Sequence, residues 1–188
     1  MKKLIMMFLS AALLVGCGSG NSQSGKEEIV EKDPTPEYVE IVQEFGYDDI
    51  SYSYPGLESA SFAHIIDEYT LEVLTFGYSG DKVKTMTDSV FYNLEGLDQD
   101  SIDYLVETID EGMEPFRKLD FCTVEFGEED DSFYRLKVEY KDMDSNDHIK
   151  KVVDLGGLQL TEDSADIVQY LSLKDTADAL VSGGWTRR

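Results

Sequence analysis

Cys17 is the residue whose position points most clearly to chemistry. It follows Lys2, Lys3 and an apolar run of 12 residues, 4–15, that only Ser10 interrupts. A bilayer span needs roughly 20 apolar residues, so this run is too short to cross a membrane and has the length of a signal-peptide core. The two lysines form the positive start that stays on the cytoplasmic side. The segment therefore predicts export, with a nucleophilic thiol directly after the cleavage point.

The sequence Leu14-Val15-Gly16-Cys17 resembles the lipobox of bacterial lipoproteins. In that family the cysteine thiol receives a diacylglyceryl group, and cleavage follows before the cysteine. The resemblance implies that residues 1–16 are removed as a lipoprotein signal peptide. It also implies that Cys17 holds the protein to the cell membrane on the extracytoplasmic side. Two acyl chains give a stable anchor where one gives only marginal binding. An ordinary secretory signal with an incidental cysteine is the alternative.

A calcium site is the next chemistry that the spacing suggests. Asp142, Asp144 and Asn146 match positions 1, 3 and 5 of an EF-hand loop. Position 6 needs glycine for the sharp turn and holds Asp147, while position 12 needs a bidentate glutamate and holds Val153. We therefore expect a polar turn between a strand and a helix, and no metal ligands. The acidic run at 128–131 has no framework for a specific site either.

The residue types that often act in catalysis, namely His, Cys and acidic residues, occur here at positions that do not suit an active site. His64 and His148 are far apart and form no metal-binding spacing. Cys122 lies among apolar residues of the predicted strand 121–126, which predicts a buried and inert thiol without a disulfide partner. Asp110 and Glu114 fall on the wet side of a predicted helix. We expect no catalytic residues, no cofactor and no enzymatic activity. An envelope enzyme that uses acidic residues is the alternative.

The charge of the chain excludes several kinds of partner. The 188 residues include 16 Lys and Arg against 39 Asp and Glu, a formal net charge of −23. Nucleic-acid binding requires basic residues, so that function is excluded. Electrostatic docking on anionic lipid is disfavoured as well, and the lipid anchor is the expected membrane attachment. With 41% hydrophobic residues, the chain has enough apolar side chains for a folded domain.

The composition divides the chain into four parts. Residues 1–16 are the signal peptide, and 17–33 are the lipidated cysteine with a flexible Gly- and Ser-rich tether. Residues 34–61 form an extension with a short helix and a Tyr-rich loop, whose tyrosines we expect to be pinned onto the core. Residues 62–188 form the main domain.

The main domain is predicted to be α+β, with a four-stranded antiparallel sheet made of two long hairpins and helices packed on one face. The strands are expected where β-branched and aromatic residues alternate with polar ones. Helices are expected where apolar residues recur every three or four positions between caps and glycines. The predicted strands are 69–78, 83–92, 121–126 and 133–143; the predicted helices are 100–118, 147–154, 163–171 and 173–181.

The chain from residue 69 onward resembles the YehR-like lipoprotein family, a bacterial group with a domain of unknown function. The resemblance rests on LVGC at 14–17, YSGDKV at 78–83 and YLSLKDTADALVSGGW at 170–185. It implies a lipid-anchored α+β domain and supplies no catalytic residues. The segment 34–61 is an addition to the pattern, and the strong acidity departs from it.

These observations predict a cell-envelope lipoprotein that acts as a binding or interaction module, with an unknown protein or small molecule as its partner. Delivery of a ligand to a membrane transporter is a further alternative. A deep apolar pocket with a few polar groups favours ligand binding. Two carboxylates buried together favour an enzyme.

Overall fold

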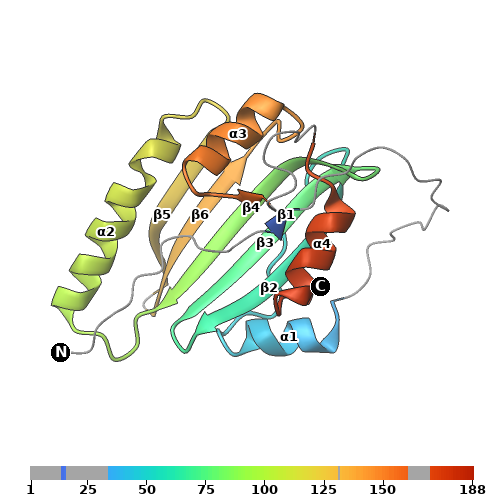
Figure 1. Ribbon diagram of the computed structural model, residues 1–188. Coiled ribbons are helices and arrows are strands. Elements are labelled where there is room, and N and C mark those ends of the chain that lie inside the picture. The colour runs from blue at the N-terminus through green and yellow to red at the C-terminus, as the bar shows by residue number, and fades with distance from the viewer. Residues whose placement is uncertain (1–13, 16–33, 131, 161–169) are drawn as a thin grey trace.

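The computed structural model describes residues 14–15, 34–130, 132–160 and 170–188. Its centre is a six-stranded antiparallel sheet with the strand order β5-β6-β4-β3-β2-β8 (Figure 1). A separate parallel pair joins β1 (Leu14–Val15) to β7 (Gln159–Leu160). The strands of the main sheet are β2 (Glu58–Asp67), β3 (Thr70–Ser79), β4 (Lys82–Asn93), β5 (Cys122–Asp130), β6 (Phe133–Tyr140) and β8 (Thr186–Arg187).

The α+β class agrees with the sequence, but the predicted four-stranded sheet is wrong, because β2 and β8 extend it. In β2, only Ile65 and Ile66 are β-branched, and small serines and alanines follow the first residue, Glu58. Its sequence therefore lacks the usual strand signal. It is nevertheless paired along its length with β3. The two residues of β8 are too few to show a periodic pattern, and they pair with Phe62 and Ala63.

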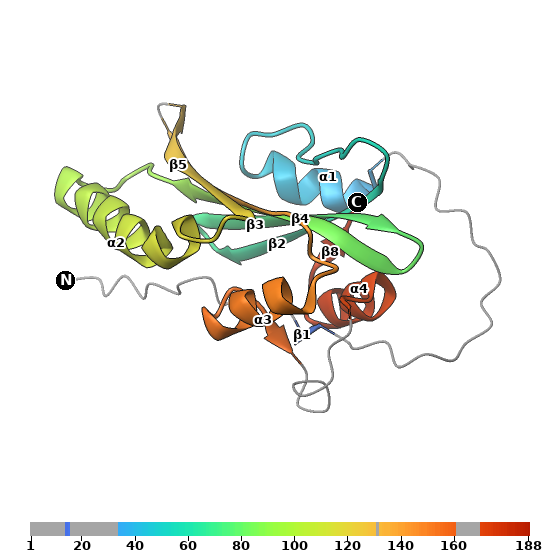
Figure 2. The same ribbon diagram turned by 90° about the horizontal axis from the view of Figure 1, so that it is seen from above.

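The predicted placement of helices on one face is also wrong, because helices cover both faces (Figure 2). On one face, Tyr38 and Val42 of α1 (Pro36–Gln43) share an apolar cluster with Leu71, Val73 and Phe91. The other face carries α2 (Gln99–Arg117), α3 (Asn146–Asp154) and α4 (Leu173–Ser182). The central strands β3 and β4 are consequently buried on both sides.

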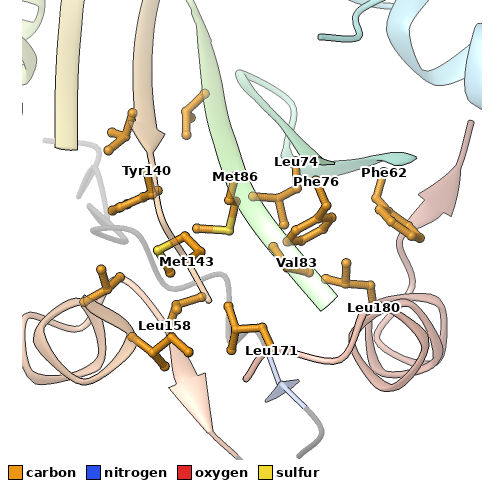
Figure 3. Packing of buried hydrophobic residues seen from close by; sticks show 14 of the residues in the cluster. Phe62, Leu74, Phe76, Val83, Met86, Tyr140, Met143, Leu158, Leu171 and Leu180 are labelled. Atoms are coloured by element: carbon orange, nitrogen blue, oxygen red, sulfur yellow. The ribbon is translucent and has the colours of Figure 1, made fainter. Parts of the chain in front are cut away.

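The larger apolar cluster fills the space between the sheet and helices α2, α3 and α4. It joins strand residues to the inward faces of the helices and to the segments that flank α4 (Figure 3). Phe62 and Phe76 meet edge to face, with ring centroids 5.9 Å apart. The labelled members in Figure 3 are Phe62, Leu74, Phe76, Val83, Met86, Tyr140, Met143, Leu158, Leu171 and Leu180.

Strand β6 has the alternation that the sequence predicts. Leu136, Val138 and Tyr140 are buried in the larger cluster. The side chains between them point to the opposite face, where Lys137 forms an ion pair of 3.5 Å with Glu125 of the neighbouring strand. This end of the sheet therefore has one wet face, unlike the central strands.

Helix α4 begins at the predicted residue and is fixed to the turn between β3 and β4. The Ser172 hydroxyl accepts a hydrogen bond from the backbone N–H of Asp175 and donates one to the Asp81 carboxylate. That carboxylate also accepts a 2.9 Å hydrogen bond from the backbone N–H of Lys174. The two sequence phrases at 78–83 and 170–185 that resemble the YehR-like family therefore meet in space, where each satisfies polar groups of the other.

The Tyr-rich loop is pinned to the sheet on the α1 side, as expected. The Tyr52 and Ser89 hydroxyls lie 2.9 Å apart, and the Tyr54 hydroxyl donates a 2.7 Å hydrogen bond to Thr87. The Tyr54 ring lies directly over Gly77, where a Cβ atom would be 2.5 Å from it. Glycine at this position is what allows the loop to approach the sheet so closely.

Some expectations concern residues that the structure does not describe. Cys17, most of the tether and nearly all of the helix expected at 163–171 lie outside the described residues. Within the described ranges, none of the helices combines the length and apolar character needed to cross a bilayer.

Candidate functional site

The EF-hand-like segment forms the turn that the sequence predicts between a strand and a helix. It connects β6 to α3, and Asp142 has a positive φ of 53° at the bend. The Asp144 carboxylate forms an ion pair with Lys84, which lowers the pKa of this carboxyl. In the described part of the chain, no three His, Cys, Asp or Glu side chains converge on a point that could hold a metal ion.

The two histidines lie in different parts of the molecule. His148 stacks on Phe121 with ring centroids 3.8 Å apart, and its Nδ1 lies 3.1 Å from the backbone oxygen of Asp142. His64 is half-buried on β2 and stacks on Trp185 at 5.2 Å. Each imidazole packs on an aromatic ring, so both serve as interfacial side chains.

Cys122 and the acids of α2 also occupy structural positions. The Cys122 thiol is half-buried, and burial raises its pKa to about 12, so the reactive thiolate does not form at neutral pH. Asp110 is exposed and forms an ion pair of 2.6 Å with Arg117. Glu114 is likewise exposed and lies 3.3 Å from the Lys118 amine.

The unusual feature of the fold is a pair of carboxyl groups inside the larger apolar cluster. Glu72 on β3 and Asp88 on β4 are only 2% and 3% exposed. Residues two positions apart in a strand point to the same face. Glu72 is two positions from Leu74, and Asp88 is two positions from Val90. Because Leu74 and Val90 belong to the larger cluster, both acids point to the face that carries α2, α3 and α4. Leu74 stands opposite Asp88 in the ladder, which makes Glu72 and Asp88 diagonal neighbours.

The two carboxyl groups are hydrogen bonded to each other. An ionised carboxylate can only accept hydrogen bonds, so the bond requires that one of the two groups carries a proton. The pKa of Glu72 is well above its usual value because of burial first and the Asp88 charge second. Burial raises the pKa of Asp88 to about 7. Glu72 therefore keeps its proton and is the donor, while Asp88 is protonated below about pH 7 and ionised above it, so the pair carries a single negative charge only above about pH 7.

The pair has unused hydrogen-bonding capacity. Glu72 Oε1 and Asp88 Oδ1 are buried and have no hydrogen-bond partner among the described residues. The buried hydroxyl of Tyr140 also lacks one. Tyr140 stands opposite Met86, two positions from Asp88, and its side chain lies on the same face. Burial is the largest cause of the raised pKa of this phenol, and the charges of Asp88 and Glu72 raise it further. The three groups therefore lie within electrostatic range of one another.

Two half-buried side chains flank the pair. His64 stands directly opposite Glu72 in the β2–β3 ladder. Tyr92 lies four positions after Asp88 on β4. The pKa of its phenol is raised mainly by burial, and to a smaller extent by the charges of Asp88 and Glu72.

Glu72, Asp88 and Tyr140 thus form what we call the acid cluster. Unpaired polar groups in an apolar core reduce stability. Buried groups with such perturbed pKa values are typical of functional sites. Chemically, the cluster can hold or release a proton, and its oxygens can accept hydrogen bonds from a bound donor.

Sequence reasoning missed this cluster. It predicted helices on one face of the sheet only, and it singled out neither Glu72 nor Asp88. The signal in the sequence is that Glu72 is the one charged residue of the β-rich run 70–78, and that Asp88 lies inside the predicted strand 83–92. Only the presence of helices on both faces makes these positions buried.

No family model matches the sequence, and no curated protein matches it. Among solved structures, the NMR structure of a protein from Streptococcus pneumoniae TIGR4 is similar, with 11% identity and a TM-score of 0.50 over 90% of this chain and 100% of that chain. The NMR structure of the E. coli YehR protein is similar over 70% of this chain and 90% of that chain, with 16% identity and a TM-score of 0.55. The chain therefore has a YehR-like fold.

Proposed function

We propose that the protein is a lipid-anchored member of the YehR-like group on the extracytoplasmic side of the cell membrane. Its domain is a binding module that takes a small ligand at the acid cluster without changing it chemically. The observation that carries the binding role is the buried Glu72–Asp88 pair with its unpartnered oxygens. The location is supported by the sequence that ends in Cys17, and the fold is compatible with it.

The fold is compatible because cleavage before Cys17 would remove β1 and leave the main sheet intact. Leu14 and Val15 pair only with β7, and β7 is not part of the six-stranded sheet. A mature chain that begins at Cys17 therefore retains every strand that builds the acid cluster.

The anchor makes a direct prediction. Cys17→Ala is expected to move the protein from the membrane fraction to the soluble fraction or to leave an unprocessed precursor, because the thiol that accepts the lipid is gone. The measurement is fractionation of the native host, with mass spectrometry of the first mature residue. Cys122→Ala is the matched control, since it removes the other cysteine and should stay membrane-bound. Processed, membrane-bound Cys17→Ala protein would disprove the anchor.

The binding role is tested with the mature domain and a panel of small probes that differ in chemistry: alkylammonium ions, divalent cations, amino acids and neutral sugars. Trp185, the only tryptophan in the chain, stacks on His64 and should report binding through its fluorescence. At least one probe class is expected to shift the fluorescence and the melting temperature of the wild type and to leave Asp88→Asn unchanged. If no class does so, the acid cluster is not a ligand site.

The buried pair also favours a second function, because two carboxyl groups with different pKa values can act as general acid and base. Conversion of a bound probe to a product would distinguish this enzyme from the binding module. In that case Glu72→Gln would retain binding and lose turnover.

A further inference from the structure

We propose that the ligand of the acid cluster is a small organic cation with a primary ammonium group, which binds by displacing the proton that Glu72 and Asp88 share. This inference rests on the proposed function and specifies its ligand. It is carried by the number, type and charge of the unpartnered groups.

The number of acceptors matches an ammonium group. A primary ammonium presents three N–H donors. The cluster offers three buried oxygens without a partner among the described residues, namely Glu72 Oε1, Asp88 Oδ1 and the Tyr140 hydroxyl. A divalent metal ion fits less well, because it requires four or more ligands and no third acidic, His or Cys side chain of the described residues joins the pair.

The charge also balances. Above about pH 7 and before binding, the pair holds one proton and one negative charge. When R–NH₃⁺ enters, its three N–H groups donate to the three oxygens, and the shared proton leaves for solvent. The pair then has two negative charges and the ligand has one positive charge. The buried site has a net charge of −1 in both states, so binding replaces a proton by a cation and adds no net charge to the core.

Among the residues that the structure describes, no lysine or arginine competes with a bound cation at the pair. The titratable side chains that face it are His64 on β2, Tyr92 on β4, and Tyr140 and Cys122 towards the β5–β6 end of the sheet. The inward residues of α2, α3 and α4 are apolar except for Thr176. No lysine or arginine contributes to the pKa of either carboxyl. His64 and Tyr92 are half-buried and mark the sides from which a small cation would enter.

The test is calorimetric titration of the mature domain with butylammonium at several pH values, with tetramethylammonium as the matched ligand that lacks N–H donors. From about pH 7 upward the affinity for butylammonium should rise about tenfold per pH unit, since one proton is released for each cation bound. Below about pH 7 the rise should be steeper, because Asp88 is then protonated as well and two protons must leave. Tetramethylammonium should bind at least about tenfold more weakly.

Variants separate the cluster from general attraction to an acidic protein. Asp88→Asn and Glu72→Gln should abolish the pH-dependent binding, and Tyr140→Phe should weaken it about fivefold to tenfold. Glu107→Gln is the control, because it removes the same charge from an exposed position on α2. Binding that is independent of pH, equal for both cations or unchanged in Asp88→Asn would overturn the inference. If butylammonium fails while another probe class binds through Asp88, the inference falls and the proposed function stands.

Discussion

Asp88→Asn is expected to raise the free energy of unfolding at pH 8 by on the order of 3 kcal/mol. The pKa of Asp88 is about 7 in the folded protein, above the ordinary value of 3.8 that applies to the unfolded chain. Between these two values the folded state binds more protons than the unfolded state. The wild type therefore loses stability as the pH rises from about 4 to about 7, and the loss is complete above that range. The uncharged amide of asparagine does not ionise.

The measurement is urea unfolding of the mature domain and the variant at pH 4 and pH 8. At pH 4 the folded state holds the proton and the unfolded chain is still roughly half protonated, so little of the loss has occurred and the two proteins should differ little. The strong acidity of the chain also lowers stability with rising pH, and Glu107→Gln controls for that contribution. A variant that is no more stable than the wild type at pH 8, relative to this control, would show that the carboxyl is not buried as a destabilising charge.

Phe62→Ala is expected to lower the free energy of unfolding by about 3–5 kcal/mol. Phe62 is fully buried on β2 and packs edge to face on Phe76. Removal of its ring leaves a cavity between the sheet and α4. The prediction tests the corrected fold, because a four-stranded sheet without β2 would leave this side chain near the edge and its loss would matter little.

Ile66→Ala on the same strand is the matched control, since Ile66 is 36% exposed. It should cost less than about 1 kcal/mol. The measurement for both variants is the midpoint and slope of urea unfolding followed by circular dichroism. Equal effects at the two positions would contradict the placement of β2 within the core.

Several local features could be read directly from the residues. The Ser172 cap, with Asp175 three positions later, places the start of α4 at the predicted residue. Gly80 and Asp81 form the expected turn between two β-rich runs, with Ser79 opposite Lys82. Such features are set by contacts within a few residues, so they are encoded locally.

The order of the strands in the sheet, and the fact that helices cover both of its faces, cannot be predicted from contacts within a few residues. The sequence of β2 has small and polar residues that resemble a loop, and it becomes a strand because β3 provides a hydrogen-bonding edge and the helices bury its Phe62. Tertiary context overrides such weak propensities. Similarly, the position of α1 depends on which face of β3 and β4 remained uncovered.

The sequence by itself determined the helix caps, the turns, the alternation of β6 and the α+β class, because each of these depends on neighbouring residues. It also carries the segment ending in Cys17, on which the proposed anchor depends. Only the tertiary structure decided that Glu72 and Asp88 meet. They are 16 positions apart in the chain, and their environment depends on helices that pack on both faces of the strands between which they lie. Burial, rather than the identity of the two acids, gives them a shared proton.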